Sequence, residues 1–167
     1  MLAIAAVAIG ILGGCSDDAD ALDRPATERA VGRAVAAQVA PPVAGTACPG
    51  TLTRAKGRRF TCTIELGAGA GTLKVVVRQV DDQGSLDVTP SAAVLSDAAI
   101  ARSLKALLKA QFDRSFQVDC GDRGDRVRPP GTTLTCTARD RTSRREVTVT
   151  ITDAAGTQSF EVLPAAG

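Results

Sequence analysis

Residues 57–63, GRRFTCT, recur 74 positions later as residues 131–137, GTTLTCT. Apolar and polar residues alternate after each copy, which is typical of strands with one buried face. The same offset of 74 pairs the apolar residues Leu73, Val75, Val77, Leu86, Val88 and Pro90 with Val147, Val149, Ile151, Phe160, Val162 and Pro164. A repeat of this length exceeds a solenoid unit, so we expect one small domain present twice.

Each unit is predicted to open with a helix. In the second unit, Ser96 is a candidate N-cap, and an apolar stripe at helical spacing follows it: Ile100, Leu104, Leu107, Leu108 and Phe112. The first unit has a weaker stripe of Thr27, Val31, Val35 and Val39, which Pro41 and Pro42 terminate. The predicted fold class is α+β: two tandem small domains, each with one N-terminal helix packed on a three- to four-stranded antiparallel sheet and one disulfide.

Four cysteines fall into two pairs within these units. Strand alternation places Cys62 on the same face as Phe60 and Ile64, and Cys136 on the face of Leu134. A further strand carrying Phe116 and Val118 ends at Cys120. We therefore expect the disulfides Cys48–Cys62 and Cys120–Cys136 beneath the helices, with free buried thiols as the alternative. Domains of about 70 residues bury little core, and such a bridge contributes about 3 kcal/mol.

The N-terminus carries an export signature. Residues 2–12, LAIAAVAIGIL, are apolar and lead into Gly13-Gly14-Cys15. A run of about 14 residues is shorter than the roughly 20 that span a bilayer and has the length of a signal-peptide core. Residues 12–15, LGGC, resemble the lipobox of bacterial lipoproteins, which implies lipidation of Cys15 and cleavage before it. No Lys or Arg precedes the run, and a buried N-terminal helix ending in a core cysteine is the alternative.

These features divide the chain into four segments. Residues 1–14 are predicted to be a lipoprotein signal peptide and 15–22 an acidic tether, followed by repeats at 23–90 and 91–167. Asp17, Asp18 and Asp20 would keep the tether extended and soluble, with cation binding as the alternative. The predicted location is the extracytoplasmic face of the cell membrane, held by a lipid anchor at Cys15.

The composition excludes several classes of function. The 167 residues include no His, and the net charge is +2. Without His, a Ser-His-Asp or Cys-His catalytic arrangement and the usual His-containing zinc sites are excluded. The small net charge argues against nucleic-acid binding. The sequence offers no catalytic residue, metal ligand or cofactor site.

The two units also carry a family resemblance. A helix, a Cys, then Gly-x-x-Phe/Leu-Thr-Cys-Thr and an alternating strand pair resemble actinobacterial domain-of-unknown-function family 4333, found in mycobacterial-type lipoproteins. The resemblance covers residues 23–90 and 96–164. Cys48-Pro49 fits the family's Cys-Pro start, whereas Cys120-Gly121 departs from it. The resemblance implies a fold and a location but no activity.

Three charged motifs are interpreted as solvated loops. Arg123-Gly124-Asp125 matches an integrin-type tripeptide that arises readily by chance. A basic run before the first strand, for which an acidic polymer or lipid headgroups are the alternative partners, consists of Arg54, Lys56, Arg58 and Arg59. A second basic group at the equivalent hairpin of the second unit is interpreted as a solvated turn: Arg139, Arg141, Arg144 and Arg145.

The expected function is a non-enzymatic module of the cell envelope that binds a partner protein or wall polymer. Two tandem domains would raise the effective concentration at a surface. The alternative is a carboxylate-dependent hydrolase or transferase acting on cell-wall material, which requires two carboxylates facing across a cleft.

Overall fold

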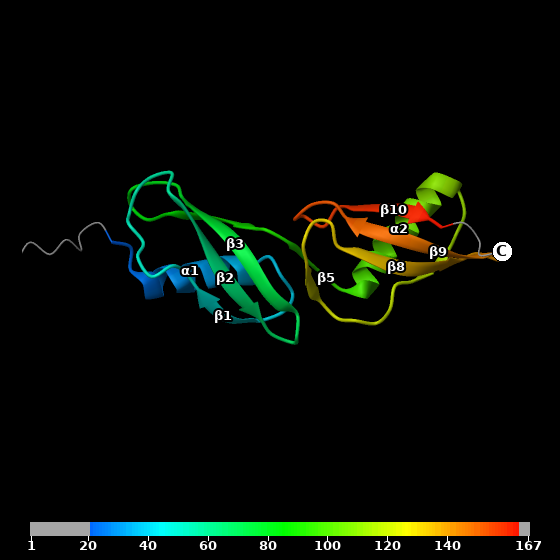
Figure 1. Ribbon diagram of the computed structural model, residues 1–167, viewed down its shortest axis with the longest axis horizontal. Coiled ribbons are helices and arrows are strands. Elements are labelled where there is room, and N and C mark those ends of the chain that lie inside the picture. Colours follow the sequence, from blue (N-terminus) through cyan, green and yellow to red (C-terminus); the bar gives the residue numbers. More distant parts are fainter. Residues whose placement is uncertain (1–20, 164–167) are drawn as a thin grey trace, which may run out of the picture.

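The computed structural model describes residues 21–163. The elements in chain order are α1 (Arg24–Ala36), β1 (Val43–Ala47), β2 (Arg59–Leu66), β3 (Gly71–Gln79), β4 (Leu86–Pro90), β5 (Ala93–Leu95), α2 (Asp97–Phe112), β6 (Gln117–Asp119), β7 (Arg126–Arg128), β8 (Thr133–Arg139), β9 (Arg144–Ile151) and β10 (Gln158–Val162). They form two groups along the long axis, with the start of α1 at one end and the β8–β9 hairpin at the other (Figure 1). The predicted signal peptide, Cys15, the tether aspartates and Pro164 lie outside the described residues.

Helix α1 follows the predicted stripe. Pro25 lies in its first turn, where a missing N–H costs no hydrogen bond. Thr27, Val31 and Val35 are buried, and Val39 packs against the same core from beyond the helix end. The helix ends at Ala36, before the two prolines but three residues short of Val39, the last residue of the predicted stripe.

Helix α2 begins at the predicted cap. The Ser96 hydroxyl accepts a hydrogen bond from the backbone N–H of Ala99 at 3.2 Å. Leu104 and Leu108 are buried, but Leu107 is 37% exposed and Phe112 is 44% exposed. The predicted apolar stripe is therefore wider than the face of α2 that the sheet covers.

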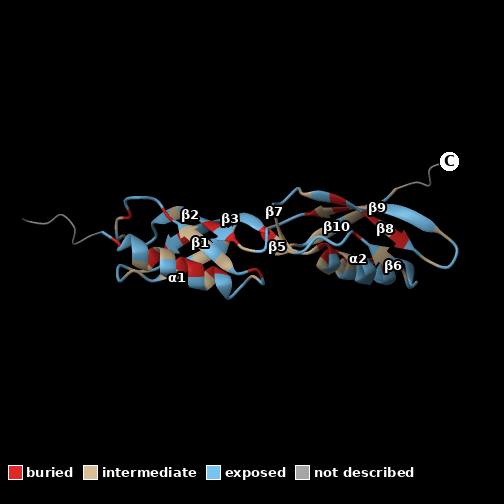
Figure 2. Ribbon diagram, turned by 90° about the horizontal axis from the view of Figure 1, so that it is seen from below, coloured by how far each residue is buried: buried red, intermediate tan, exposed pale blue. Residues whose placement is uncertain are grey.

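Two antiparallel four-stranded sheets account for most strands. Their orders are β1-β2-β3-β4 and β6-β8-β9-β10. Buried and exposed residues alternate along β2 and β3, as the sequence predicted. Each sheet contributes to its own cluster of buried apolar residues together with one helix, and Figure 2 shows buried residues in both groups. The α+β class and the antiparallel sheets are thus confirmed.

The strand register differs between the two sheets. Cys62 lies opposite Val75 on β3, whereas Cys136 lies opposite Val147 on β9. The second hairpin is therefore two residues shorter, and beyond it equivalent positions are 72 residues apart. The constant offset of 74 was wrong there. A shift of two residues leaves every side chain on its original face, so alternation alone does not distinguish the two registers.

The turns that follow give the same offset of 72. Asp81 accepts hydrogen bonds from the backbone N–H groups of Gln83 and Ser85. Asp153 accepts the corresponding bonds from Ala155 and Thr157. The glycine in each turn, Gly84 or Gly156, has a positive φ of 95° or 87°, a conformation that favours glycine. The two turns therefore share one design.

A third, two-stranded sheet joins the two groups. It pairs β5 with β7, and the Val127 N–H donates to the Ala70 carbonyl in the β2–β3 loop at 2.9 Å. Val94 and Val127 both pack against the first core, although they follow it in sequence, while Leu95 packs against the second. These contacts connect residues of the second segment to the core of the first.

Candidate functional site

Both predicted disulfides are present. Cys48 bonds to Cys62 across 14 residues, and Cys120 bonds to Cys136 across 16 residues. All four cysteines are buried. Each bridge joins the residue that follows an edge strand to the middle of the neighbouring strand, so it closes one side of a core. The cysteines therefore have a structural role.

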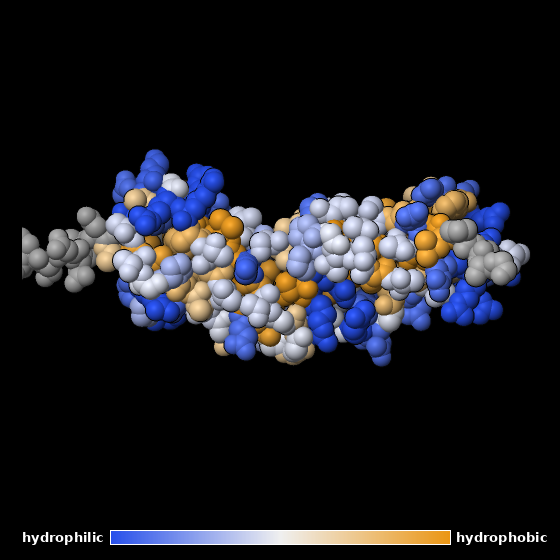
Figure 3. All heavy atoms as spheres, viewed as in Figure 1, coloured by the Kyte–Doolittle hydropathy of each residue, from blue (hydrophilic) through white to orange (hydrophobic). Residues whose placement is uncertain are grey.

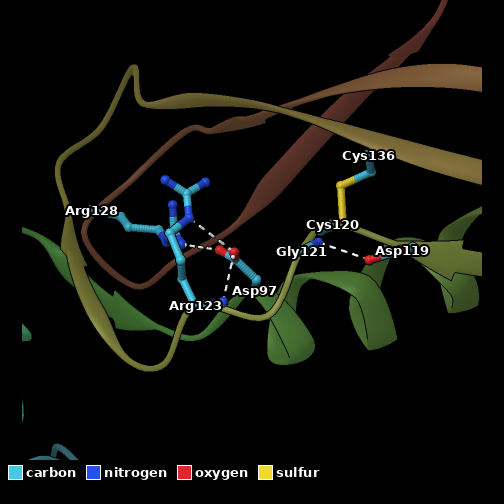
Figure 4. The surroundings of a disulfide bond; sticks show 7 residues. All are labelled: Asp97, Asp119, Cys120, Gly121, Arg123, Arg128 and Cys136. Atoms are coloured by element: carbon cyan, nitrogen blue, oxygen red, sulfur yellow. Dashed lines mark hydrogen bonds and ion pairs between the residues drawn. A yellow bond between two sulfur atoms is a disulfide. The ribbon is translucent and has the colours of Figure 1, made fainter.

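Beside the second disulfide lies a buried ion pair that the sequence did not indicate (Figure 4). Asp97, the first residue of α2, is fully buried, and its Oδ1 bonds to Nη2 of Arg128 on β7. Arg123 adds its backbone N–H and its Nε, each 3.1 Å from Oδ2. Burial alone raises the pKa of Asp97, but hydrogen bonds and charge from Arg123, together with the charge of Arg128, outweigh burial and lower the pKa.

The ion pair also accounts for the Arg-Gly-Asp tripeptide. Arg123 is bound to Asp97, so the tripeptide is part of a loop fastened to the start of α2. Gly121, two residues earlier, has a φ of 102°, and a Cβ there would lie 2.9 Å from Oδ2 of Asp97. The interpretation of the tripeptide as a loop is therefore supported, and Arg123 stabilises the fold by holding this loop to Asp97.

An apolar pocket, which we call the α2 pocket, lies between the C-terminal end of α2 and the second sheet. Its volume is about 360 Å³, within the range of about 300–1,000 Å³ typical of small-molecule sites. Its apolar lining consists of Leu108, Phe112, Phe116, Ala138, Val147 and Val162. Three of these (Leu108, Ala138 and Val147) are buried and form the floor.

The walls of the α2 pocket leave apolar surface in contact with solvent. The rings of Phe112 and Phe116 meet edge to face with centroids 6.1 Å apart. Phe112 and Val162 remain exposed. Figure 3 shows apolar surface among hydrophilic groups at this end of the molecule.

Polar groups surround the pocket mouth: Arg114, Asp140, Ser143 and Arg145. Asp140 accepts hydrogen bonds from the backbone N–H groups of Thr142 (2.9 Å) and Ser143 (2.7 Å). These bonds, and those of the two hydroxyls, lower its pKa to about 2. Nη1 of Arg114 lies 3.6 Å from its Oδ2. Within residues 21–163, Arg145 forms no ion pair.

A larger groove of about 540 Å³ lies between α1 and the edge strand β1. Its walls are the polar surface of the helix, including Glu28 and Arg29, and the small residues of β1. Glu28 accepts the backbone N–H of Cys48 at 3.0 Å and pairs with Arg24, and both interactions lower its pKa. The groove has no aromatic lining residue, so the α2 pocket is the better candidate for binding an organic ligand.

The two basic groups of the sequence occupy different surroundings. Arg54, Lys56 and Arg58 lie in the exposed loop before β2, where the Lys56 N–H donates to Oδ1 of Asp82. The second group, Arg139 to Arg145, forms the β8–β9 hairpin, and one of its members lines the α2 pocket. Sequence alternation places Arg145 on the face of Val147, which is the signal that could have identified it.

The described part of the chain has neither a metal cluster nor a membrane span. Within residues 21–163, no group of three or more His, Cys, Asp or Glu side chains is arranged to hold a metal ion. No helix in that range is long and apolar enough to cross a membrane.

Comparison with known proteins gives one match. The family described as Domain of unknown function (DUF4333) matches residues 6–84. This match covers less than half of the chain and includes α1 and the Cys48–Cys62 bridge. No curated protein matches the chain, and no solved structure matches it. The family likeness thus concerns the first half and states no activity.

Proposed function

We propose that this chain is a lipid-anchored protein of the extracytoplasmic membrane face that binds a small apolar ligand without catalysing a reaction. The observation that carries the binding proposal is the α2 pocket. It has an apolar floor, two aromatic walls and only four polar lining residues. This composition is that of a ligand site, in which apolar burial supplies affinity and a few polar groups orient the ligand.

A neutral apolar dye, N-phenyl-1-naphthylamine, tests the pocket. We expect its fluorescence to rise on binding and the Phe112→Ser variant to lower its affinity at least tenfold. Leu107→Ser is the matched control, because Leu107 lies on the same helix with similar exposure but does not line the pocket. Equal loss in both variants, or no dye binding at all, would refute the pocket as a ligand site.

The anchor is proposed from the sequence. The apolar run and the LGGC tetrapeptide at residues 12–15 support lipidation of Cys15. Two or more acyl chains, each contributing about 0.8 kcal/mol per buried methylene, give stable membrane attachment. Wild-type protein should incorporate labelled fatty acid in its native host, and Cys15→Ala should not. Absence of label from the wild type would overturn this part of the proposal.

We also propose that residues 23–90 and 91–167 are two copies of one domain, each with its own disulfide. The shared strand order, the matching cysteine positions and the two equivalent turns support this view. Residues 91–167 should then unfold cooperatively under oxidising conditions.

Val94 and Val127 pack against the first core, so both become exposed when residues 91–167 are produced alone. Val127→Thr should therefore raise the solubility of this segment. A segment without a cooperative transition would contradict the two-domain layout.

A carboxylate-dependent enzyme receives no support from the α2 pocket. Asp140 is the acidic residue among its lining side chains, and with a pKa of about 2 it stays ionised near neutral pH. A general acid must hold a proton at the working pH, which this group does not.

A further inference from the structure

We propose that the ligand of the α2 pocket is a single-chain anionic amphiphile, whose acyl chain enters the pocket and whose anionic head binds Arg145. This inference rests on the proposed ligand-binding function and specifies the chemical class of the ligand.

The volume and lining of the pocket suit a single acyl chain of the ligand. About 360 Å³ lies near the lower end of the range for small-molecule sites, which suits one acyl chain better than a two-chain lipid. The floor of Leu108, Ala138 and Val147 offers carbon surface without a polar group that a ligand must satisfy. Each methylene moved from water onto such a surface contributes about 0.8 kcal/mol.

The charged residues that line the α2 pocket favour an anionic head group on the ligand. Two arginines and one aspartate line the pocket, so an anion is favoured there over a cation. Asp140 is already engaged by the hairpin turn and lies near Arg114. Arg145 has no ion-pair partner within residues 21–163, which leaves its guanidinium for a ligand carboxylate or phosphate.

Strand geometry directs this cation to the pocket. Arg145 shares a β9 face with Val147 in the pocket floor, and Arg145 lies opposite Ala138 in the register. Its neighbour Arg144 points to the other face of the strand and lines a different surface hollow beside β6. The two arginines thus differ in position relative to the pocket but not in charge.

The pocket lies at the end of the molecule opposite the start of α1. The start of α1 and the β8–β9 hairpin occupy opposite ends of the long axis (Figure 1). Cys15 precedes the first described residue by six positions.

The test compares decanoate with decanol as competitors of bound N-phenyl-1-naphthylamine, both below their aggregation limits. We expect decanoate to displace the dye from the wild-type chain at a concentration at least tenfold lower. Arg145→Gln should abolish this preference while leaving displacement by decanol unchanged. Arg144→Gln, with the same change in charge, should retain it.

The outcomes separate the two proposals. If the dye binds but decanoate and decanol compete equally, the pocket binds apolar ligands and the anionic class is wrong. If Arg144→Gln and Arg145→Gln reduce the preference equally, general surface charge rather than the pocket arginine is responsible, and the inference also fails. If the dye does not bind in the α2 pocket, the proposed function itself fails. Decyl phosphate in place of decanoate, with an alkyl chain of nearly equal length, shows whether phosphate heads are preferred to carboxylates.

Discussion

Asp97 and Arg128 form an ion pair in which both side chains are withdrawn from water: the Asp97 side chain is fully buried and that of Arg128 is 7% exposed. They come from the start of α2 and from β7, 31 residues apart. Arg128 also donates from Nε to the Leu95 carbonyl. The pair fastens the second helix to the two-stranded sheet that joins the two groups.

Asp97→Asn should destabilise the protein by about 3–5 kcal/mol, because it leaves the Arg128 charge buried without a counter-ion. Urea unfolding followed by circular dichroism measures the change. Arg123→Gln should cost less, since the Arg123 side chain is 61% exposed and stays hydrated when unpaired. An Asp97→Asn midpoint equal to that of Arg123→Gln would show that burial of the pair is energetically unimportant.

The β8–β9 turn should confer pH-dependent stability. The folded-state pKa of Asp140 is about 2, below its ordinary value of 3.8. Its contribution is therefore fully present above pH 3.8 and is lost as the pH falls towards 2. The difference in unfolding midpoint between wild type and Asp140→Asn should be constant above about pH 5 and shrink below 3.8. A difference that grows on acidification would contradict the assigned hydrogen bonds.

Each disulfide should stabilise the fold separately. Loops of 14 and 16 residues correspond to about 3 kcal/mol each on the loop-entropy account. The double variants Cys48→Ala/Cys62→Ala and Cys120→Ala/Cys136→Ala should show losses of this size in urea unfolding. Mass spectrometry of the unreduced protein provides the control, because four alkylatable thiols would exclude both bridges.

The two faces of α2 should respond differently to truncation. Leu104 is buried in the second core, so Leu104→Ala should cost about 2–5 kcal/mol through lost burial and an unfilled cavity. Leu107→Ala should cost clearly less, because Leu107 already contacts solvent. Chemical denaturation of the two variants, made in the same background, compares them directly. Equal losses would place Leu107 in the core.

The features that the sequence predicted correctly depend on residues close together along the chain. The Ser96 cap and the Ile100–Leu108 stripe predicted α2, and two prolines predicted the end of α1, since helix periodicity and proline sterics act within a few residues. Strand parity predicted which cysteines share a buried face. It did not predict that the second hairpin is shorter, because a two-residue slip preserves parity.

The sequence by itself determined the helices, the alternating strands and the two disulfide pairs, because each depends on residues close along the chain or on residue type. Only the tertiary structure decided the Asp97–Arg128 pair, the packing of Val94 and Val127 on the first core, and the meeting of Phe112, Val162 and Arg145 around one pocket. These contacts join residues far apart in sequence. The periodicity of a helix or strand does not indicate which solvent-facing positions of separate elements lie side by side. The candidate site is formed by such contacts, so the residues that line it could be identified only from the tertiary structure.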